Sequence, residues 1–190
     1  NMPLCGIPIL ALTGVNQGHK NRVVRAAKER FSMRVALVPP LQNPGWKLPD
    51  LHSDSRARIQ FQIALHRAQV AAEELTGIVA LFNNVELIIT DRTRLDAEAH
   101  FADTQARQDV INALRCDARV EMGVYDKVVH LRSMRPETTF EGAPASPTNL
   151  HQQRIRLLWR EHLDFHSIGH TQLQHSIDYV LRQASSMIDT

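Results

Sequence analysis

The residues with the clearest potential for chemistry gather in one short segment near the start of the chain, residues 13–21. Gly14 and Lys20 have the spacing at which a phosphate-binding loop of the pattern Gly-x-x-x-x-Gly-Lys-[Ser/Thr] places its first glycine and its lysine. In such a loop, glycine lets the backbone approach the phosphates, the lysine neutralises their charge, and the N-terminus of the next helix favours an anion. The segment therefore predicts that Gly14 and Lys20 bind phosphate.

Two defining positions of this Walker A pattern hold other residues. His19 stands at the second glycine and adds a side chain where the backbone normally approaches the phosphates, an effect that Gly18 could offset in part. Asn21 stands at the Ser/Thr position, whose hydroxyl normally ligates Mg²⁺, and it offers an amide oxygen with a different reach. On this segment alone, a phosphate loop and an ordinary strand–loop–helix turn with a chance lysine both remain open.

Other polar residues with potential roles lie further along the chain. Asp91 and Arg92 directly follow the apolar run of residues 85–90, and Arg154 follows a stretch rich in Pro, Gly, Ser and Thr. Asp91 could equally cap the next helix, and Arg154 could be a solvated helix charge. The histidines near the end of the chain form no His-Glu-x-x-His pattern, which disfavours a zinc site.

The elements that must position these residues alternate between strands and helices. Strands are expected at 7–12, 34–38, 85–90, 127–131 and 165–168, and helices at 21–31, 55–82, 95–101, 104–116, 150–162 and 172–188. The expected buried stripe of the long helix consists of Ile59, Ile63, Ala64, Val70, Ala71 and Leu75. Alternation of this kind predicts an α/β fold with a central, mainly parallel five-stranded sheet covered on both faces. Ligands of such sheets bind at the carboxyl ends of the strands, here after Leu12, Val38, Thr90 and Leu131.

Composition predicts one domain, residues 1–190, with a flexible lid at about 133–156. The formal net charge of +2 is only weak support for a nucleic-acid partner. Cys5 and Cys116, the only two cysteines, form no metal motif, so we expect reduced thiols in the cytoplasm or another reducing compartment. The apolar residues 7–12 are too few to span a membrane, so no membrane partner is expected.

The segment Leu87-Ile-Ile-Thr-Asp91-Arg92 resembles the apolar strand followed by Asp-Arg in P-loop small-molecule kinases. That group includes the thymidylate, deoxynucleoside and nicotinamide riboside kinase-like proteins and the related AAA-type ATP-binding proteins. The order of the degenerate Walker A segment, the long helix, this strand and the Arg154 helix is similar to the order in that family. The resemblance implies a three-layer P-loop fold, a nucleotide partner, and ATP with Mg²⁺ as cofactors.

The resemblance also implies roles for individual residues. Lys20 would hold the β- and γ-phosphates, with Gly14, Gly18, His19 and Asn21 completing the nucleotide-binding segment. Asp91 would lie near Mg²⁺ or the phosphoryl acceptor, together with Asn21 as a metal ligand, and Arg92 would lie on the acceptor side. Arg154, or Arg156 in its place, would close over the transferring phosphate.

A further departure concerns the end of the second strand, where kinases of this type often carry an acid that helps to activate the acceptor hydroxyl. Val38, Pro39 and Pro40 stand there instead. With His19 and Asn21, this favours a nucleotide-binding pseudoenzyme with impaired or absent catalysis. One alternative is an active ATP-dependent phosphotransferase acting on a nucleoside-like small molecule. The other is a non-catalytic subunit of a protein or RNA-containing assembly, suggested only by the mild basic excess and by Arg22, Arg25, Arg30 and Arg34.

Overall fold

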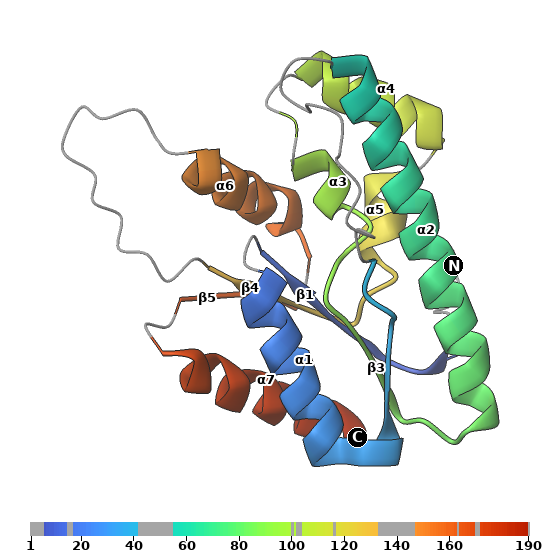
Figure 1. Ribbon diagram of the computed structural model, residues 1–190, viewed down its shortest axis with the longest axis vertical. Helices are drawn as coiled ribbons and strands as arrows, with labels where there is room; N and C mark the ends of the chain where they lie inside the picture. The colour runs from blue at the N-terminus through green and yellow to red at the C-terminus, as the bar shows by residue number, and fades with distance from the viewer. Residues whose placement is uncertain are drawn as a thin grey trace.

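The computed structural model has a five-stranded sheet at its centre, and its elements are labelled in Figure 1. It describes residues 6–14, 17–41, 55–99, 101, 104–115, 117–132, 147–162, 164–169 and 172–189. The strands are β1 (Ile9–Thr13), β2 (Val35–Leu37), β3 (Leu87–Thr90), β4 (Lys127–Leu131) and β5 (Phe165–Ile168). Their order across the sheet is β2-β3-β1-β4-β5, and every neighbouring pair is parallel. The predicted α/β fold with a parallel sheet is therefore confirmed.

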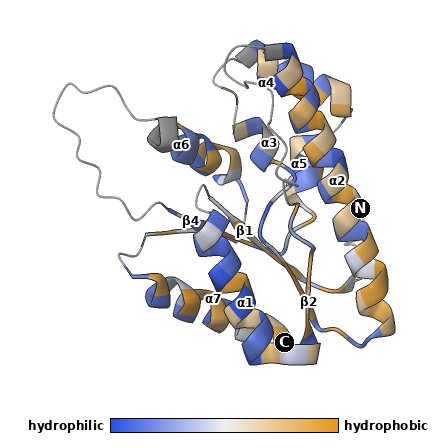
Figure 2. Cartoon of the chain, in the orientation of Figure 1, coloured by the Kyte–Doolittle hydropathy of each residue, from blue (hydrophilic) through white to orange (hydrophobic). Residues whose placement is uncertain are grey.

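Both faces of the sheet are buried, which explains why its strands are apolar without alternation. In β1, Ile9 and Ala11 belong to the core on one face, and Leu10 and Leu12 belong to the core on the other. Figure 2 shows these strands as a hydrophobic band through the middle of the molecule. Because β1, β3 and β4 are parallel, their carboxyl ends lie along one edge of the sheet.

Helices form a layer on each face (Figure 1). One layer consists of α1 (Gln17–Phe31) and α7 (Leu173–Ile188), whose apolar side chains pack on β1, β3 and β4. The opposite layer consists of α2 (Ser55–Phe82), α3 (Asp96–Ala99), α5 (Ala118–Met122) and α6 (Pro147–Trp159). α4 (Thr104–Leu114) packs on α2 through a small separate core that includes Ile63 and Val110. Among the helices of the described ranges, none is both long and apolar enough to cross a membrane.

The buried face of α2 differs from the expected one. Of the apolar stripe predicted for this helix, Ile63 is buried, but Leu75 is 61% exposed. Polar side chains fill much of the buried face instead: Gln62, His66, Gln69, Glu73 and Thr76. The predicted stripe was wrong because this face of α2 packs against other polar groups. Gln69 and Glu73 form hydrogen bonds there, so polar rather than apolar side chains are buried. The second half of α2 leaves a set of apolar side chains exposed: Leu75, Ile78, Val79, Leu81 and Phe82.

Element boundaries also differ from the predictions at two places near the expected site. α1 begins at Gln17, so the segment after Gly14 is shorter than the predicted loop of residues 13–21, and Gly18, His19 and Lys20 lie in the first helical turn. Gln17 donates its amide to Asn21 one turn later at 2.9 Å, a contact that favours this early start. α6 begins at Pro147 rather than at residue 150, because proline suits the first position of a helix. Residues 147–156 of the predicted lid are therefore helical, and residues 133–146 lie outside the described ranges.

Candidate functional site

The predicted site residues lie along the edge formed by the carboxyl ends of the strands. Gly14 directly follows β1, and the first turn of α1 carries Gly18, His19, Lys20 and Asn21. Asp91 and Arg92 directly follow β3, which neighbours β1 in the sheet. Since the two strands are parallel, their ends bring these two segments together, as the topology rule predicts.

Gly14 is required by the close packing of the chain at this edge. Its φ is +132°, a conformation that residues with a side chain rarely adopt. A Cβ atom at this position would lie 2.3 Å from the carbonyl oxygen of Leu131 at the end of β4. The glycine thus lets the chain at the end of β1 lie against the end of β4, a requirement that holds with or without a bound phosphate.

Lys20 is buried, with only 4% of its surface exposed. Burial lowers the pKa of its ammonium group, the negative charges of Asp96 and Asp91 oppose that effect, and the charge of Arg92 adds to it. A buried ammonium group needs compensating negative charge, which two carboxylates supply here. The same position would place the lysine beside a phosphate at the N-terminal turn of α1.

Asp91 is held by the side-chain amide of Gln17 in α1. This amide donates to Asp91 Oδ2 and, at 2.9 Å, to Asn21 Oδ1, so it contacts both oxygens. Asn21 and Asp91, the two predicted metal ligands, are therefore neighbours that bring an amide oxygen and a carboxylate to one place. Oxygen donors of this kind suit Mg²⁺, so these residues fit the metal that the resemblance in the sequence implies.

Asp96 is a member of the site that the motif comparison did not assign. Its carboxylate accepts hydrogen bonds from the Thr13 hydroxyl at 2.6 Å, the Thr93 hydroxyl at 2.6 Å and the Thr93 backbone N–H at 3.2 Å. Burial alone would raise the pKa of Asp96, but the charges of Lys20 and Arg92 and these hydrogen bonds outweigh it and lower the pKa. The spacing Thr93-x-x-Asp96 is that of a capping box, and this was the signal in the sequence that could have found it.

Arg92 is half-buried and lies close enough to Lys20 and Asp96 for its charge to act on both. Its backbone carbonyl accepts the Thr90 hydroxyl at 2.8 Å and the Gln69 amide at 3.2 Å, which hold the turn after β3 in place. Its Nη2 atom is buried and has no hydrogen-bond partner within the described ranges. A polar ligand at this edge would satisfy that donor.

Arg154 lies apart from this group. Its Nη1 donates to the carbonyl oxygen of Ala99 at 3.4 Å, and the ring of His151 lies 3.1 Å from the same oxygen. These contacts hold the Arg154 side chain at the C-terminus of α3, where helix carbonyls attract cations. The structure thus brings Lys20, Asn21, Asp91 and Arg92 together and directs Arg154 to α3.

A buried polar network supports the turn that carries Asp91 and Arg92, and it was not found from the sequence. Arg94 forms an ion pair with Glu73 of α2 at 2.6 Å, and its backbone N–H donates to the Tyr125 hydroxyl at 2.8 Å. The Tyr125 hydroxyl in turn donates to Glu73 at 2.8 Å, and Gln69 donates to the same carboxylate oxygen at 2.8 Å. Burial raises the pKa of Tyr125 well above its ordinary value, and the Glu73 charge adds to that rise. The network joins α2, the turn after β3 and the chain before β4.

His130 is fully buried at the end of β4, beside the turn at Gly14. Its Nδ1 lies 3.1 Å from the Ser167 hydroxyl, and its Nε2 has no hydrogen-bond partner in the part of the chain that the structure describes. Burial lowers the pKa of His130 to about 4, with the nearby Asp96 opposing the shift. The imidazole is therefore neutral at pH 7 and adds no charge to the site.

Comparisons with known proteins identify the fold. No family model and no curated protein matches the sequence. The thymidylate kinase from Ehrlichia chaffeensis matches in structure with a TM-score of 0.53 at 14% identity, over 93% of this chain and 98% of that chain. The deoxyadenosine kinase from M. mycoides with bound dATP matches with a TM-score of 0.52 at 12% identity, over 93% of this chain and 99% of that one.

The chain therefore has the three-layer α/β fold of the P-loop kinases. Its structural neighbours are P-loop nucleoside kinases, which confirms, at the level of the fold, the resemblance inferred from the order of the motifs.

Proposed function

We propose that this chain is a P-loop kinase-like protein that binds a nucleotide through its phosphates and has reduced or lost phosphoryl transfer. One observation carries the proposal. Lys20 lies buried in the first turn of α1, with Asp91 and Asp96 compensating its charge. Lys20 thus lies at the edge of the sheet where ligands of this fold class bind.

Three features support nucleotide binding. The N-terminal turn of α1 and the ammonium group of Lys20 favour an anion at this edge. The unpartnered Nη2 of Arg92 adds a donor that a phosphate oxygen would satisfy. Asn21 and Asp91 would hold Mg²⁺, whose charge offsets that of the phosphates. ATP with Mg²⁺ is thus the ligand that these residues fit.

The surroundings of these residues favour weak or absent catalysis. Gln17 donates to Asp91 Oδ2 and therefore competes with a metal for that oxygen. The charge of Lys20 is stabilised by those of Asp96 and Asp91, and a phosphate would compete with both carboxylates for it. Pro39 and Pro40 follow β2, where a carboxylate would help to activate an acceptor hydroxyl. Each change weakens the positioning and charge neutralisation on which phosphoryl transfer depends.

An active ATP-dependent phosphotransferase for a nucleoside-like acceptor is the second candidate, and Asp96 is the observation that favours it. This carboxylate lies close enough to Lys20 to affect its pKa and has its own pKa lowered, so it is ionised at pH 7. It could take the place of the acid absent after β2. The assembly alternative is weakened because Arg34, one of its four arginines, pairs with Glu86 at 2.8 Å.

A thermal-shift panel of nucleotides with and without Mg²⁺ tests the binding proposal. A ligand that binds only the folded state at about 100 times its Kd adds about 2.7 kcal/mol of stability, so ATP or ADP should raise the Tm clearly. Lys20→Ala should abolish this rise, whereas Arg25→Ala, an exposed change on the same helix, should leave it intact. Circular dichroism of both variants confirms that they are folded.

Turnover of ATP with a panel of nucleosides separates the two candidates. We expect the unchanged chain to consume ATP in the presence of Mg²⁺ no faster than the Lys20→Ala variant does, which would indicate that phosphoryl transfer is reduced or lost. Phosphorylation of any nucleoside well above that level would establish the phosphotransferase instead. The absence of a Tm shift with every nucleotide would refute nucleotide binding altogether.

A further inference from the structure

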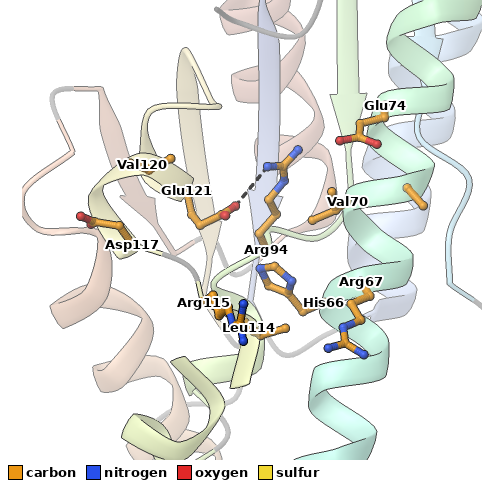
Figure 3. A pocket seen from close by; sticks show the side chains of 11 residues that line it. His66, Arg67, Val70, Glu74, Arg94, Leu114, Arg115, Asp117, Val120 and Glu121 are labelled. Carbon is orange, nitrogen blue, oxygen red and sulfur yellow. Dashed lines mark hydrogen bonds and ion pairs between the residues drawn. The ribbon is translucent and has the colours of Figure 1, made fainter. Parts of the chain in front are cut away.

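A pocket lined in part by Arg94 lies outside the candidate site formed by Lys20 and Asp91. It has a volume of about 570 Å³ and is bounded by α2, the end of α4 and α5 (Figure 3). Its polar lining consists of His66, Arg67, Glu74, Arg94, Arg115, Asp117 and Glu121. Lys20 and Asp91 do not contribute to it. The volume falls within the range of roughly 300–1,000 Å³ that is usual for small-molecule sites.

His66 is the feature of this pocket that points to a ligand. The residue is 7% exposed, and neither of its ring nitrogens has a hydrogen-bond partner in the described part of the chain. Figure 3 shows its imidazole within the pocket, between Arg94 and Arg115. Burial lowers the pKa of His66, so the ring is neutral at pH 7 and presents one donor and one acceptor. Buried polar atoms that remain unpaired cost free energy, which a complementary ligand would recover.

The charges of the lining are separated along the pocket. On α2, Arg67 and Glu74 are seven residues apart, which corresponds to about 10 Å along a helix. In Figure 3, Arg115 lies on the Arg67 side of the pocket, and Glu121 lies across from α2 beyond His66. Arg67 and Arg115 have no ion pair within the described ranges, whereas Arg94 is already engaged by Glu73 and Glu121. One end of the pocket therefore offers two guanidinium groups without an ion pair in the described ranges, and the other offers the carboxylate of Glu74, since that of Glu121 is paired with Arg94.

We propose that this pocket binds a short peptide of two or three residues with free termini. Its carboxylate pairs with Arg67 and Arg115, and its ammonium group pairs with Glu74. Two or three extended residues span roughly 7–10 Å, which is comparable to the spacing of the charged ends. A peptide group between the termini has one N–H and one C=O, which match the acceptor and the donor of neutral His66. Val70, Leu114 and Val120 provide apolar walls for the peptide side chains.

The test uses trialanine and its doubly capped form, N-acetyl-trialanine amide, with the full chain. Chemical-shift titration of the ¹⁵N-labelled protein should show trialanine shifting the resonances around His66 and α5, and the capped form should leave them unmoved. Arg115→Gln should weaken trialanine binding about tenfold, the effect of losing one charged hydrogen bond. His66→Leu should weaken it several-fold. Arg119→Gln, an exposed change on α5 outside the pocket, is the matched control and should have no effect.

Several results would overturn the proposal. These are the absence of any titration by trialanine at millimolar concentration, equal binding of the capped peptide, and unchanged binding by both Arg115→Gln and His66→Leu. Displacement of trialanine by ATP with Mg²⁺ would also overturn it, because it would place the peptide at the Lys20 site. Arg115 is exposed, so its variant remains informative even if His66→Leu alters the fold. The peptide test does not depend on whether the chain binds a nucleotide.

Discussion

Asp96 accepts a hydrogen bond from the Thr13 hydroxyl at 2.6 Å, which ties the end of β1 to the first residue of α3. The two residues are 83 positions apart in the sequence, and both are buried. The charge of Lys20 also lowers the pKa of Asp96, so the Asp96 carboxylate interacts with both the end of β1 and the first turn of α1. This relationship motivates the first prediction.

Asp96→Asn should destabilise the fold by about 2–4 kcal/mol, because it removes the charge that compensates buried Lys20 and one acceptor of the threonine hydrogen bonds. The pKa of Asp96 is lowered in the folded state, so its stabilising contribution is present above its ordinary pKa of 3.8 and is lost as the pH falls through the folded value. Urea denaturation at neutral pH and at a pH below 3.8 measures both effects. Asp109→Asn, on an exposed face of α4, is the control and should change stability by less than about 0.5 kcal/mol.

Gly14→Ala should destabilise the protein by about 3 kcal/mol or more, because the new Cβ would lie 2.3 Å from the Leu131 carbonyl oxygen at an unfavourable φ. Gly123→Ala is the matched control. Gly123 has a φ of −68°, and its new Cβ would meet its nearest neighbours at an ordinary 3.5 Å, so this variant should be neutral or slightly more stable. Equilibrium urea denaturation compares the two. Equal stability of both variants would mean that the turn after β1 relaxes freely.

His130 should make the protein less stable in mild acid. Its pKa is lowered to about 4 from an ordinary value of 6.5, so the unfolded chain binds a proton that the folded protein excludes between those values. Its contribution to the free energy of unfolding should therefore fall by about 2 kcal/mol from about pH 7 to about pH 5. His130→Gln should lose that part of the pH dependence. Proton NMR of the His130 ring offers a direct check, because titration near its ordinary pKa would contradict the prediction.

Tyr125→Phe should destabilise the protein by about 2 kcal/mol, since it removes the donor to Glu73 and leaves the Arg94 backbone N–H without its acceptor. The edge-on packing of the ring on Trp159, at 5.7 Å between centroids, is retained in the variant, so the loss reports the hydroxyl. Tyr179→Phe is the control. Tyr179 lies half-buried on α7, and we expect its replacement to change stability by less than about 0.5 kcal/mol. Thermal or urea denaturation measures both variants, and equal losses would argue against a special role for the network.

Several elements could be predicted well because their signals are local. The bounds of α2, β4 and β5 match the predicted ranges, since a long run without proline and short runs between turn residues are strong signals. α1 and α6 begin earlier than predicted, because Gln17 and Pro147 favour helix starts that the apolar periodicity did not include. α5 was missed because it is short and its signal is mainly the N-cap Asp117.

The sequence by itself determined the kinds of elements, their parallel arrangement, and the edge where Gly14, Lys20 and Asp91 meet. Strands that alternate with helices allow few other arrangements, and parallel strands place their carboxyl ends together. Only the tertiary structure decided which charges face one another: Lys20 with Asp96 and Asp91, and Arg94 with Glu73 and Glu121. It also decided that α2 buries His66 and Gln69 rather than Leu75. These partnerships depend on contacts between residues distant in sequence, whose energies no local pattern records.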